Sequence, residues 1–341
     1  MIGITFEGGG TRGSYQIGSY LAFLDCHIRP NGVCGTSIGA FNAAMIAAKE
    51  EKELLDFWQN IDIAKTLKLQ DLKNIKIKTI PKAINNVLEV VKNKGVDTNG
   101  MREELQRRLD VNKFYKSNID YGLCTVKLNT LTPLYKYKKD IPKSKLIDYI
   151  LASCYLPLFK MEKIIDGNYY IDGGFYDNSP VDMLIKKGYK KIYCVGIKGI
   201  GRHRKRPNNV HIIDILPSRP LGGVINLSSE KMNENIKIGY FDTLKVLKGY
   251  DGYKYCFKKR SNRYYDFISR KIDKKLLERC KKFWKVKTNK EAIIKSLEFI
   301  MREEHISYFK IYHPYRLAKF IKKVYNKKYF VYKLIKQLKF I

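Results

Sequence analysis

Three short apolar segments of this chain run directly into glycine-rich turns, and this repetition constrains the fold more than any other feature. The segments are 2–6, 33–34 and 169–171, followed by Gly8-Gly9-Gly10, by Gly35-Thr36-Ser37-Ile38-Gly39 and by Asp172-Gly173-Gly174. Short apolar runs bounded by turn residues are typical of buried strands. The chain is therefore expected to contain an α/β domain in which these turns follow buried strands.

Strand and helix patterns continue to alternate after these segments. Further strands are predicted at 121–128, 134–137, 191–197 and 210–215, and helices at 14–26, 40–48, 144–153 and 180–187. Such alternation predicts that the sheet of this α/β domain is largely parallel. Residues 50–115 carry mixed charge and few strand signals, so we predict that they form a helical insertion or lid.

Ser37 is the first candidate catalytic residue. In the pattern G-x-S-x-G, glycines at positions 35 and 39 leave room for a sharp strand-to-helix turn that exposes the serine hydroxyl. The intervening Thr36 and Ile38 complete this nucleophile elbow, and the following Ala-rich helix offers amide donors at its start. The alternative interpretation is a glycine-rich turn in which Ser37 only caps the helix.

The segment Gly8-Gly9-Gly10-Thr11-Arg12-Gly13 also follows a strand and opens a helix. It fits the dinucleotide pattern G-x-G-x-x-G, but 28–33 lacks the acidic residue that such a site needs. It also lacks the lysine of a phosphate-binding P-loop. The remaining interpretation is a cradle of backbone amides for an anion, which beside a nucleophilic serine is the oxyanion of a tetrahedral intermediate.

Asp172 is the candidate partner of Ser37, because a carboxylate at the end of a strand could accept the hydroxyl proton. A lone Asp-Gly-Gly is more often only a turn. A Ser-His-Asp triad would need a histidine after the acid. We expect the downstream histidines to be structural or exposed rather than catalytic: His203, His211, His305 and His313.

Taken in order, these motifs resemble the patatin-like phospholipase family. The resemblance assigns Gly8 to Gly13 to the oxyanion loop, Gly35 to Gly39 to the nucleophile elbow and Asp172-Gly173-Gly174 to the acid of a catalytic dyad. The segments 152–159 (A-S-x-x-x-P-x-F) and 178–181 (N-x-P-V) also resemble the family. The resemblance covers roughly residues 1–247.

The resemblance implies a three-layer patatin-like fold and a Ser-Asp dyad hydrolase that acts on lipid acyl esters such as phospholipids. Ser37 would be the nucleophile and Asp172 the general base, and amides of Gly9, Gly10 and Thr11 would bind the oxyanion. Arg12 would steady the loop or favour an anionic head group. The reaction needs no cofactor or metal, and the sequence offers no ligand cluster for one. The alternative is a non-catalytic lipid- or membrane-binding protein on the same scaffold.

The charge of the chain is concentrated near its end. The net charge is +33, and residues 251–341 contain 27 basic and 8 acidic residues. We therefore predict a patatin-like domain over 1–250 and a basic, mainly helical extension over 251–341. Such a balance favours anionic partners, namely a membrane surface or a polyanion.

The end of the extension has two apolar stripes at helical spacing. They comprise Leu317, Phe320, Ile321 and Val324, and Val331, Leu334, Ile335 and Leu338, with lysines between them. This pattern suits the surface of an anionic membrane, and it equally suits a helix that packs its stripe on the main domain. No nucleic-acid motif is present, so no specific nucleic acid is expected. The sequence leaves the oligomeric state open.

Composition bears on the cellular location. The chain has no apolar run of 18 residues and no signal-like start, so we expect neither a transmembrane helix nor secretion. Its seven cysteines are scattered and include no C-x-x-C pair, which favours free thiols in a reducing compartment. We therefore expect a cytoplasmic protein, peripheral at the inner membrane face.

Overall fold

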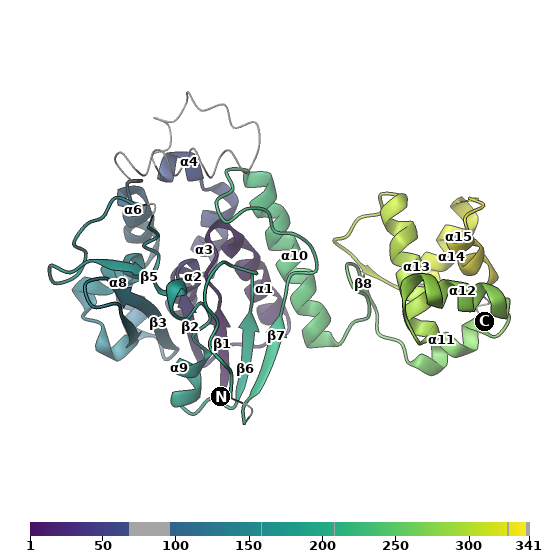
Figure 1. The fold of residues 1–341 in the computed structure, drawn as a ribbon, viewed down its shortest axis with the longest axis horizontal. Helices are drawn as coiled ribbons and strands as arrows, with labels where there is room; N and C mark the ends of the chain where they lie inside the picture. Colours follow the sequence, from purple (N-terminus) through teal and green to yellow (C-terminus); the bar gives the residue numbers. More distant parts are fainter. Residues whose placement is uncertain (68–95, 158, 208, 326, 339–341) are drawn as a thin grey trace. The chain divides into compact units, whose positions relative to one another are not determined.

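The computed structural model describes residues 1–67, 96–157, 159–207, 209–325 and 327–338 (Figure 1). The chain divides into two compact units, Met1–Tyr240 and Phe241–Ile341. The division falls inside one helix, α10 (Ser229–Lys248). The part of the predicted lid between residues 68 and 95 lies outside the described residues.

A seven-stranded sheet forms the centre of the first unit. In spatial order it contains β4 (Thr132–Tyr137), β3 (Asp120–Lys127), β2 (Gly32–Thr36), β1 (Ile2–Phe6), β6 (Lys191–Val195) and β7 (His211–Ile215), with β5 (Tyr170–Asp172) paired to β3. The pairs among β3, β2, β1, β6 and β7 are parallel, whereas β4 and β5 run antiparallel to β3. The predicted strands and the mostly parallel sheet are confirmed.

Helices cover both faces of this sheet, which gives the three layers expected. They are α1 (Ser14–Asp25), α2 (Ile38–Ala47), α3 (Glu51–Asn60), α4 (Ile63–Thr66), α6 (Asn99–Arg108), α7 (Val111–Lys116), α8 (Leu146–Ser153) and α9 (Val181–Lys186). Helices α2 and α8 pack against β3, and α9 packs on the other face against β2 and β6. In the parts of the chain that the structure describes, no helix is long and apolar enough to cross a membrane.

Helices α1 and α10 cross with their backbones in contact. A Cβ atom added at Gly18 of α1 would overlap the carbonyl oxygen of Ile236, and one at Gly239 of α10 would overlap that of Tyr15. Two glycines therefore allow a distance between the helices that no larger residue would permit.

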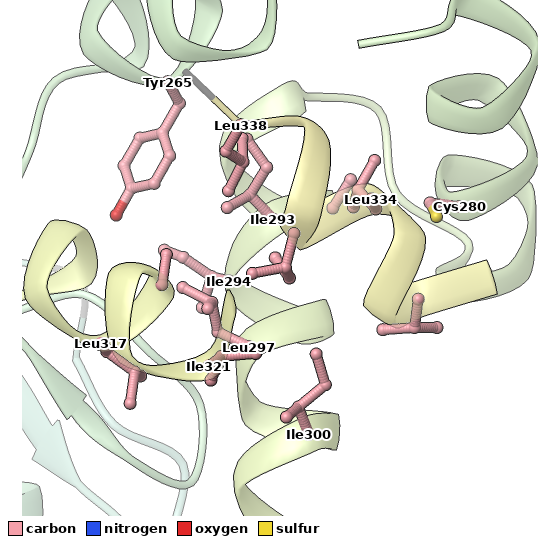
Figure 2. Packing of buried hydrophobic residues seen from close by; sticks show 14 of the residues in the cluster. Tyr265, Cys280, Ile293, Ile294, Leu297, Ile300, Leu317, Ile321, Leu334 and Leu338 are labelled. Carbon is pink, nitrogen blue, oxygen red and sulfur yellow. The ribbon is translucent and has the colours of Figure 1, made fainter. Parts of the chain in front are cut away.

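The second unit is mainly helical and has its own core (Figure 2). It contains α11 (Asn262–Ser269), α12 (Lys274–Trp284), α13 (Asn289–Glu303), α14 (Pro314–Val324) and α15 (Phe330–Gln337), with the parallel pair β8 (Cys256–Phe257) and β9 (Ile311–Tyr312).

The two predicted apolar stripes lie on α14 and α15, and the packing of most of their residues differs from both alternatives, a membrane surface and the main domain. Leu317, Ile321, Leu334 and Leu338 are buried against α13 residues such as Leu297, inside their own unit (Figure 2). They therefore neither face a membrane nor need the first unit as their packing partner. Phe320 and Val324 belong to the same sequence pattern but point outward, and both are about half exposed.

The crossing of α1 and α10 predicts the effect of a small substitution. Replacing Gly18 with Ala should lower the free energy of unfolding by about 1–3 kcal/mol, because the new methyl group has no room against the Ile236 carbonyl. Chemical denaturation measures this change. Gly223→Ala is the matched control, since its Cβ would lie 3.2 Å from the nearest atom, and equal losses in both variants would contradict the crossing.

Candidate active site

The pairing of β3 brings Ser37 and Asp172 together. Thr36, the last residue of β2, pairs with Cys124 of β3, and Asp172, the last residue of β5, pairs with Thr125. Because β2 runs parallel to β3 and β5 runs antiparallel to it, the carboxyl ends of β2 and β5 point toward each other along β3. Ser37 directly follows Thr36, so both candidate catalytic residues stand where these two carboxyl ends meet.

Ser37 has an unusual backbone conformation. Its φ of 56° and ψ of −132° lie in a region that costs a non-glycine residue about 1–3 kcal/mol. A Cβ at Gly35 would overlap the backbone of Gly39, and a Cβ at Gly39 would overlap the Phe6 carbonyl. The two glycines of the motif are therefore required for this sharp turn, as the sequence predicts.

Hydrogen bonds from neighbouring segments hold the strained turn. The Ser37 amide donates to Oγ of Ser153 at 2.9 Å, and that hydroxyl donates to the Cys124 carbonyl at 2.6 Å. The Thr36 hydroxyl donates to the Asp177 carbonyl at 2.7 Å. The surroundings therefore fix the Ser37 backbone from two directions.

The carboxyl group of Asp172 is buried, with 3% of the residue exposed. Its Oδ1 accepts a hydrogen bond from the Gly174 amide at 2.7 Å. Its buried Oδ2 has no hydrogen-bond partner within the described part of the chain. The Ser37 hydroxyl lies close enough to the carboxyl group to favour its ionised form. Burial raises the pKa of Asp172 to about 6, against the opposing effects of the Ser37 hydroxyl and the Gly174 amide.

The glycine loop passes beside Ser37. A Cβ at Gly8 would lie 3.0 Å from the Cβ of Ser37. The amide of Gly8 donates to the Asn178 carbonyl at 3.1 Å, and the amide of Thr11 donates to that of Val224 at 2.8 Å.

These hydrogen bonds reduce the number of loop amides that are free to bind an oxyanion. The amides of Gly9 and Gly10 make no hydrogen bond to any of the described residues, whereas those of Gly8 and Thr11 are occupied. Arg12 is occupied as well: its Nε donates to the Gly222 carbonyl at 2.9 Å and its Nη1 donates to that of Lys198. Arg12 therefore joins two loops that flank the glycine loop.

Glu7 has a structural role that the sequence did not suggest. This residue is 4% exposed, and its carboxylate accepts hydrogen bonds from the amides of Lys198 and Gly199 at 3.0 and 3.2 Å. Its Oε1 lies 2.9 Å from Nε2 of His203. The position of Glu7 could have indicated this role, because it is the one charged residue between an apolar strand and the glycine loop. His203 contacts this carboxylate, which agrees with the expected structural role.

A second set of buried polar groups fixes the start of the glycine loop. The Gln16 side chain donates to the Glu7 carbonyl at 2.6 Å, and Asn42 donates to Gln16 at 2.8 Å and to the Gly13 carbonyl at 3.0 Å. The Trp58 indole donates to Asn42 at 3.0 Å. Helices α1, α2 and α3 are therefore linked through hydrogen bonds behind Ser37.

An apolar cavity of about 90 Å³ opens beside Ser37. Gly10 and Thr11 also line it, and apolar side chains form most of its wall: Ile38, Phe41, Phe57, Ile61, Ile63, Leu67, Met101, Leu105, Leu156 and Phe159. Helices α3, α4 and α6 of the predicted lid contribute to this wall. Cys154 lies in the cavity too, near the Ser37 hydroxyl, and burial raises the pKa of its thiol well above the usual range.

Comparison with known proteins identifies the family. The sequence model of the family described as Patatin-like phospholipase matches residues 4–185. The chain belongs to the patatin-like phospholipase family. A curated relative is the patatin-like phospholipase domain-containing protein 7 of Rattus norvegicus, which is 24% identical over 198 residues. That alignment covers 58% of this chain and 13% of the relative, so the chain spans only a small part of that protein's length.

A solved structure with a similar chain is VipD from Legionella pneumophila. The superposition has a TM-score of 0.44 at 14% sequence identity, and it covers 98% of this chain and 83% of that one. The patatin-like match over residues 4–185 contains Gly8–Gly13, Ser37 and Asp172. No cluster of three or more His, Cys, Asp or Glu residues that could hold a metal ion occurs among the described residues.

The burial of Asp172 predicts a pH-dependent cost to stability. A raised pKa means that the folded protein holds this proton more tightly than the unfolded chain, so stability is lost as the pH rises through about 6. Above this pH, the free energy of unfolding of Asp172→Asn should therefore exceed that of the wild type by about 3 kcal/mol. The difference should vanish below about pH 4.

Denaturant titrations of the two proteins across this pH range measure the difference. Glu162→Gln is the control, because it removes an exposed carboxyl group of the same unit and should give no such gain. A wild type that is as stable as Asp172→Asn at pH 8 would contradict the assigned cost of burial.

Proposed function

We propose that this chain is a lipid acyl hydrolase in which Ser37 is the nucleophile and Asp172 its general base. The observation that carries the proposal is the buried Asp172 carboxylate, which lies close to the Ser37 hydroxyl and whose Oδ2 has no hydrogen-bond partner among the described residues. Membership of the patatin-like phospholipase family supports a carboxylic ester of a lipid as the substrate.

In the first half-reaction, Oγ of Ser37 attacks the carbonyl carbon of the ester while Oδ2 of Asp172 takes the hydroxyl proton. The carbonyl oxygen becomes an oxyanion, for which the amides of Gly9 and Gly10 are the donors without another partner among the described residues. Asp172 then gives its proton to the leaving alcohol as the ester bond breaks. An acyl group remains on Ser37.

In the second half-reaction, water releases the acyl group. Asp172 accepts a proton from the water as its oxygen attacks the acyl carbon, and the same two amides bind the second oxyanion. Collapse of this intermediate breaks the bond to Oγ, and the proton held by Asp172 returns to Ser37. The products are a carboxylic acid and the free enzyme, and the steps use neither a metal nor an organic cofactor.

The proposal needs a reason why an aspartate can act as the base. An ordinary carboxyl group with a pKa near 4 is a weak base toward a serine hydroxyl. Burial removes the water that would stabilise the carboxylate and raises the pKa of Asp172 to about 6. A higher pKa makes the carboxylate more basic while leaving it mostly ionised near neutral pH.

The cavity beside Ser37 supports a substrate with an acyl chain. Its wall is almost entirely apolar, so it would bind a hydrocarbon chain with the ester next to the hydroxyl. The same cavity would serve the alternative function, lipid binding without hydrolysis. A serine-reactive fluorophosphonate separates the two, because labelling of Ser37 requires an activated hydroxyl.

The domain roles and the location follow as proposals from the sequence. We infer a hydrolase domain over 1–250, with 50–115 as its cover, and a basic extension over 251–341 in a cytoplasmic protein. Because the stripes of α14 and α15 are largely buried, contact of the extension with an anionic membrane would use exposed lysines such as Lys319 and Lys333.

The dyad predicts the effect of substitutions at Ser37 and Asp172. Ser37→Ala and Asp172→Asn should each reduce kcat for hydrolysis of p-nitrophenyl esters by about a thousandfold or more, because each removes one member of a unit that works together. Asp177→Asn is the matched control: Asp177 is also buried with a raised pKa, but its carboxylate contacts Tyr135. Substantial activity in Ser37→Ala would refute the nucleophile assignment.

The pKa of the proposed base predicts the pH profile. Only the ionised form of Asp172 accepts a proton, so kcat/KM should fall about tenfold for each pH unit below about 6 and level off above it. Steady-state rates on a soluble ester between pH 4.5 and 8, in one ionic strength, measure this profile. A rate that stays constant down to pH 4.5 would contradict the role of Asp172.

A further inference from the structure

A cationic loop leaves the end of β6 at the same edge of the sheet as Ser37. Residues 198–206 read Lys-Gly-Ile-Gly-Arg-His-Arg-Lys-Arg. The buried Glu7 carboxylate holds the start of this loop through the amides of Lys198 and Gly199, and His203 contacts the same carboxylate. Both ends of the segment 198–203 are therefore fixed to the residue that precedes the glycine loop.

This loop contacts both halves of the candidate site. Gly199 packs on the Gly8 carbonyl so closely that it admits no Cβ, and Gly8 in turn lies beside Ser37. The Arg202 amide donates to the Gly174 carbonyl at 2.8 Å, and Gly174 donates its own amide to Asp172. The loop therefore begins and turns next to groups that contact the proposed nucleophile and base.

Three of the five Lys and Arg side chains of the loop are exposed and have no acidic partner among the described residues. Lys198, Arg202 and Lys205 form no ion pair with any of the described residues, whereas Arg204 lies 3.9 Å from Asp182 and Arg206 lies 2.6 Å from Asp214. The guanidinium groups of Arg202 and Arg204 lie 5.9 and 5.5 Å from the centre of the Tyr176 ring. Stacking on the aromatic ring holds both cations in place, and the charge of Arg202, which has no acidic partner among the described residues, stays accessible.

Two large apolar side chains accompany these cations. Ile200 is 84% exposed, and Phe175, which follows the Asp172-Gly173-Gly174 turn, is 54% exposed. Neither side chain gains stability for the fold by pointing into water. Exposed apolar groups among unpaired cations have the composition of a surface that enters the interface of an anionic bilayer.

We propose that Phe175 and residues 198–206, which we call the rim, dock on an anionic phospholipid bilayer. Ile200 and Phe175 enter the interfacial region, and Lys198, Arg202 and Lys205 bind lipid phosphates. Docking here brings the edge of the sheet that carries Ser37 toward the lipid. The inference rests on the proposed lipid hydrolase function and names the surface that meets the substrate.

The test uses the full chain and two vesicle compositions. Binding to vesicles of phosphatidylcholine alone and of phosphatidylcholine mixed with phosphatidylglycerol is measured by sedimentation, in a Ser37→Ala background that separates binding from hydrolysis. Arg202→Glu/Lys205→Glu should reduce partitioning onto the anionic vesicles at least about tenfold, and Ile200→Ser should reduce it severalfold. Raising the salt concentration should weaken wild-type binding as well.

Matched controls separate the rim from the overall positive charge. Lys190→Glu/Lys191→Glu makes the same change of charge at the opposite end of β6, where both side chains are exposed. Val246→Ser removes an exposed aliphatic side chain of the second unit. Both controls should bind as the wild type does, and thermal melting of each variant shows whether it is folded.

The outcomes distinguish the inference from the proposed function. Equal loss of binding in Lys190→Glu/Lys191→Glu, or unchanged binding in both rim variants, would overturn the docking surface. In the Ser37-containing protein, the ratio of hydrolysis on anionic vesicles to hydrolysis of a soluble ester should fall with the rim substitutions. A wild type that binds anionic vesicles through the rim but hydrolyses neither substrate would refute the proposed function and leave the docking surface standing.

Discussion

One edge of β3 pairs with two different strands, and the candidate site exists because of this arrangement. Strand β2 occupies the first part of that edge and β5 the next part, and their register leaves no residue of β3 between Cys124 and Thr125. Backbone hydrogen bonds of a sheet set positions along a strand to within a residue. The distance between Ser37 and Asp172 is thus determined by the ladder of β3 and does not depend on the length of chain between them.

Two features of the candidate site lower the stability of the folded chain. Ser37 has a backbone conformation that disfavours a side chain, and Asp172 is held away from water with an unpaired oxygen among the described residues. Such features persist only where the surroundings over-determine them. Here the Ser153 hydroxyl, the Thr36 side chain and the buried Gln16–Asn42–Trp58 network supply the compensating hydrogen bonds.

The sequence predicted local features well and distant contacts poorly. Strand β1, the turn at Ser37 and helix α2 follow from apolar patterning and from glycines that the backbone requires, so they were readable from short segments. The contacts of Glu7 with residues 198–203 join positions about 190 residues apart, and no periodicity reports such a contact.

Amphipathic patterns had a related limit. The spacing of Leu317 and Ile321 correctly indicated a helix, but spacing gives no information about what covers the apolar face. The structure shows that these residues pack in the core of their own unit, while Phe320 from the same pattern is exposed. Neither alternative for the stripe included a separate core in the second unit, because the residues of that core are spread over five helices and the segment around β8.

Because β2 and β5 end next to each other on β3, the geometry of the candidate site does not depend on the length of the segments that connect these strands. The register of β2 and β5 on β3 sets the distance between Ser37 and Asp172, whatever the length of chain between α2 and β3 or between β4 and β5. Insertions and deletions in those segments can therefore reshape the cavity wall, to which α3, α4 and α6 contribute, while Ser37 and Asp172 keep their spacing. A scaffold of this kind lets the cavity change its shape while the geometry of the candidate site is preserved.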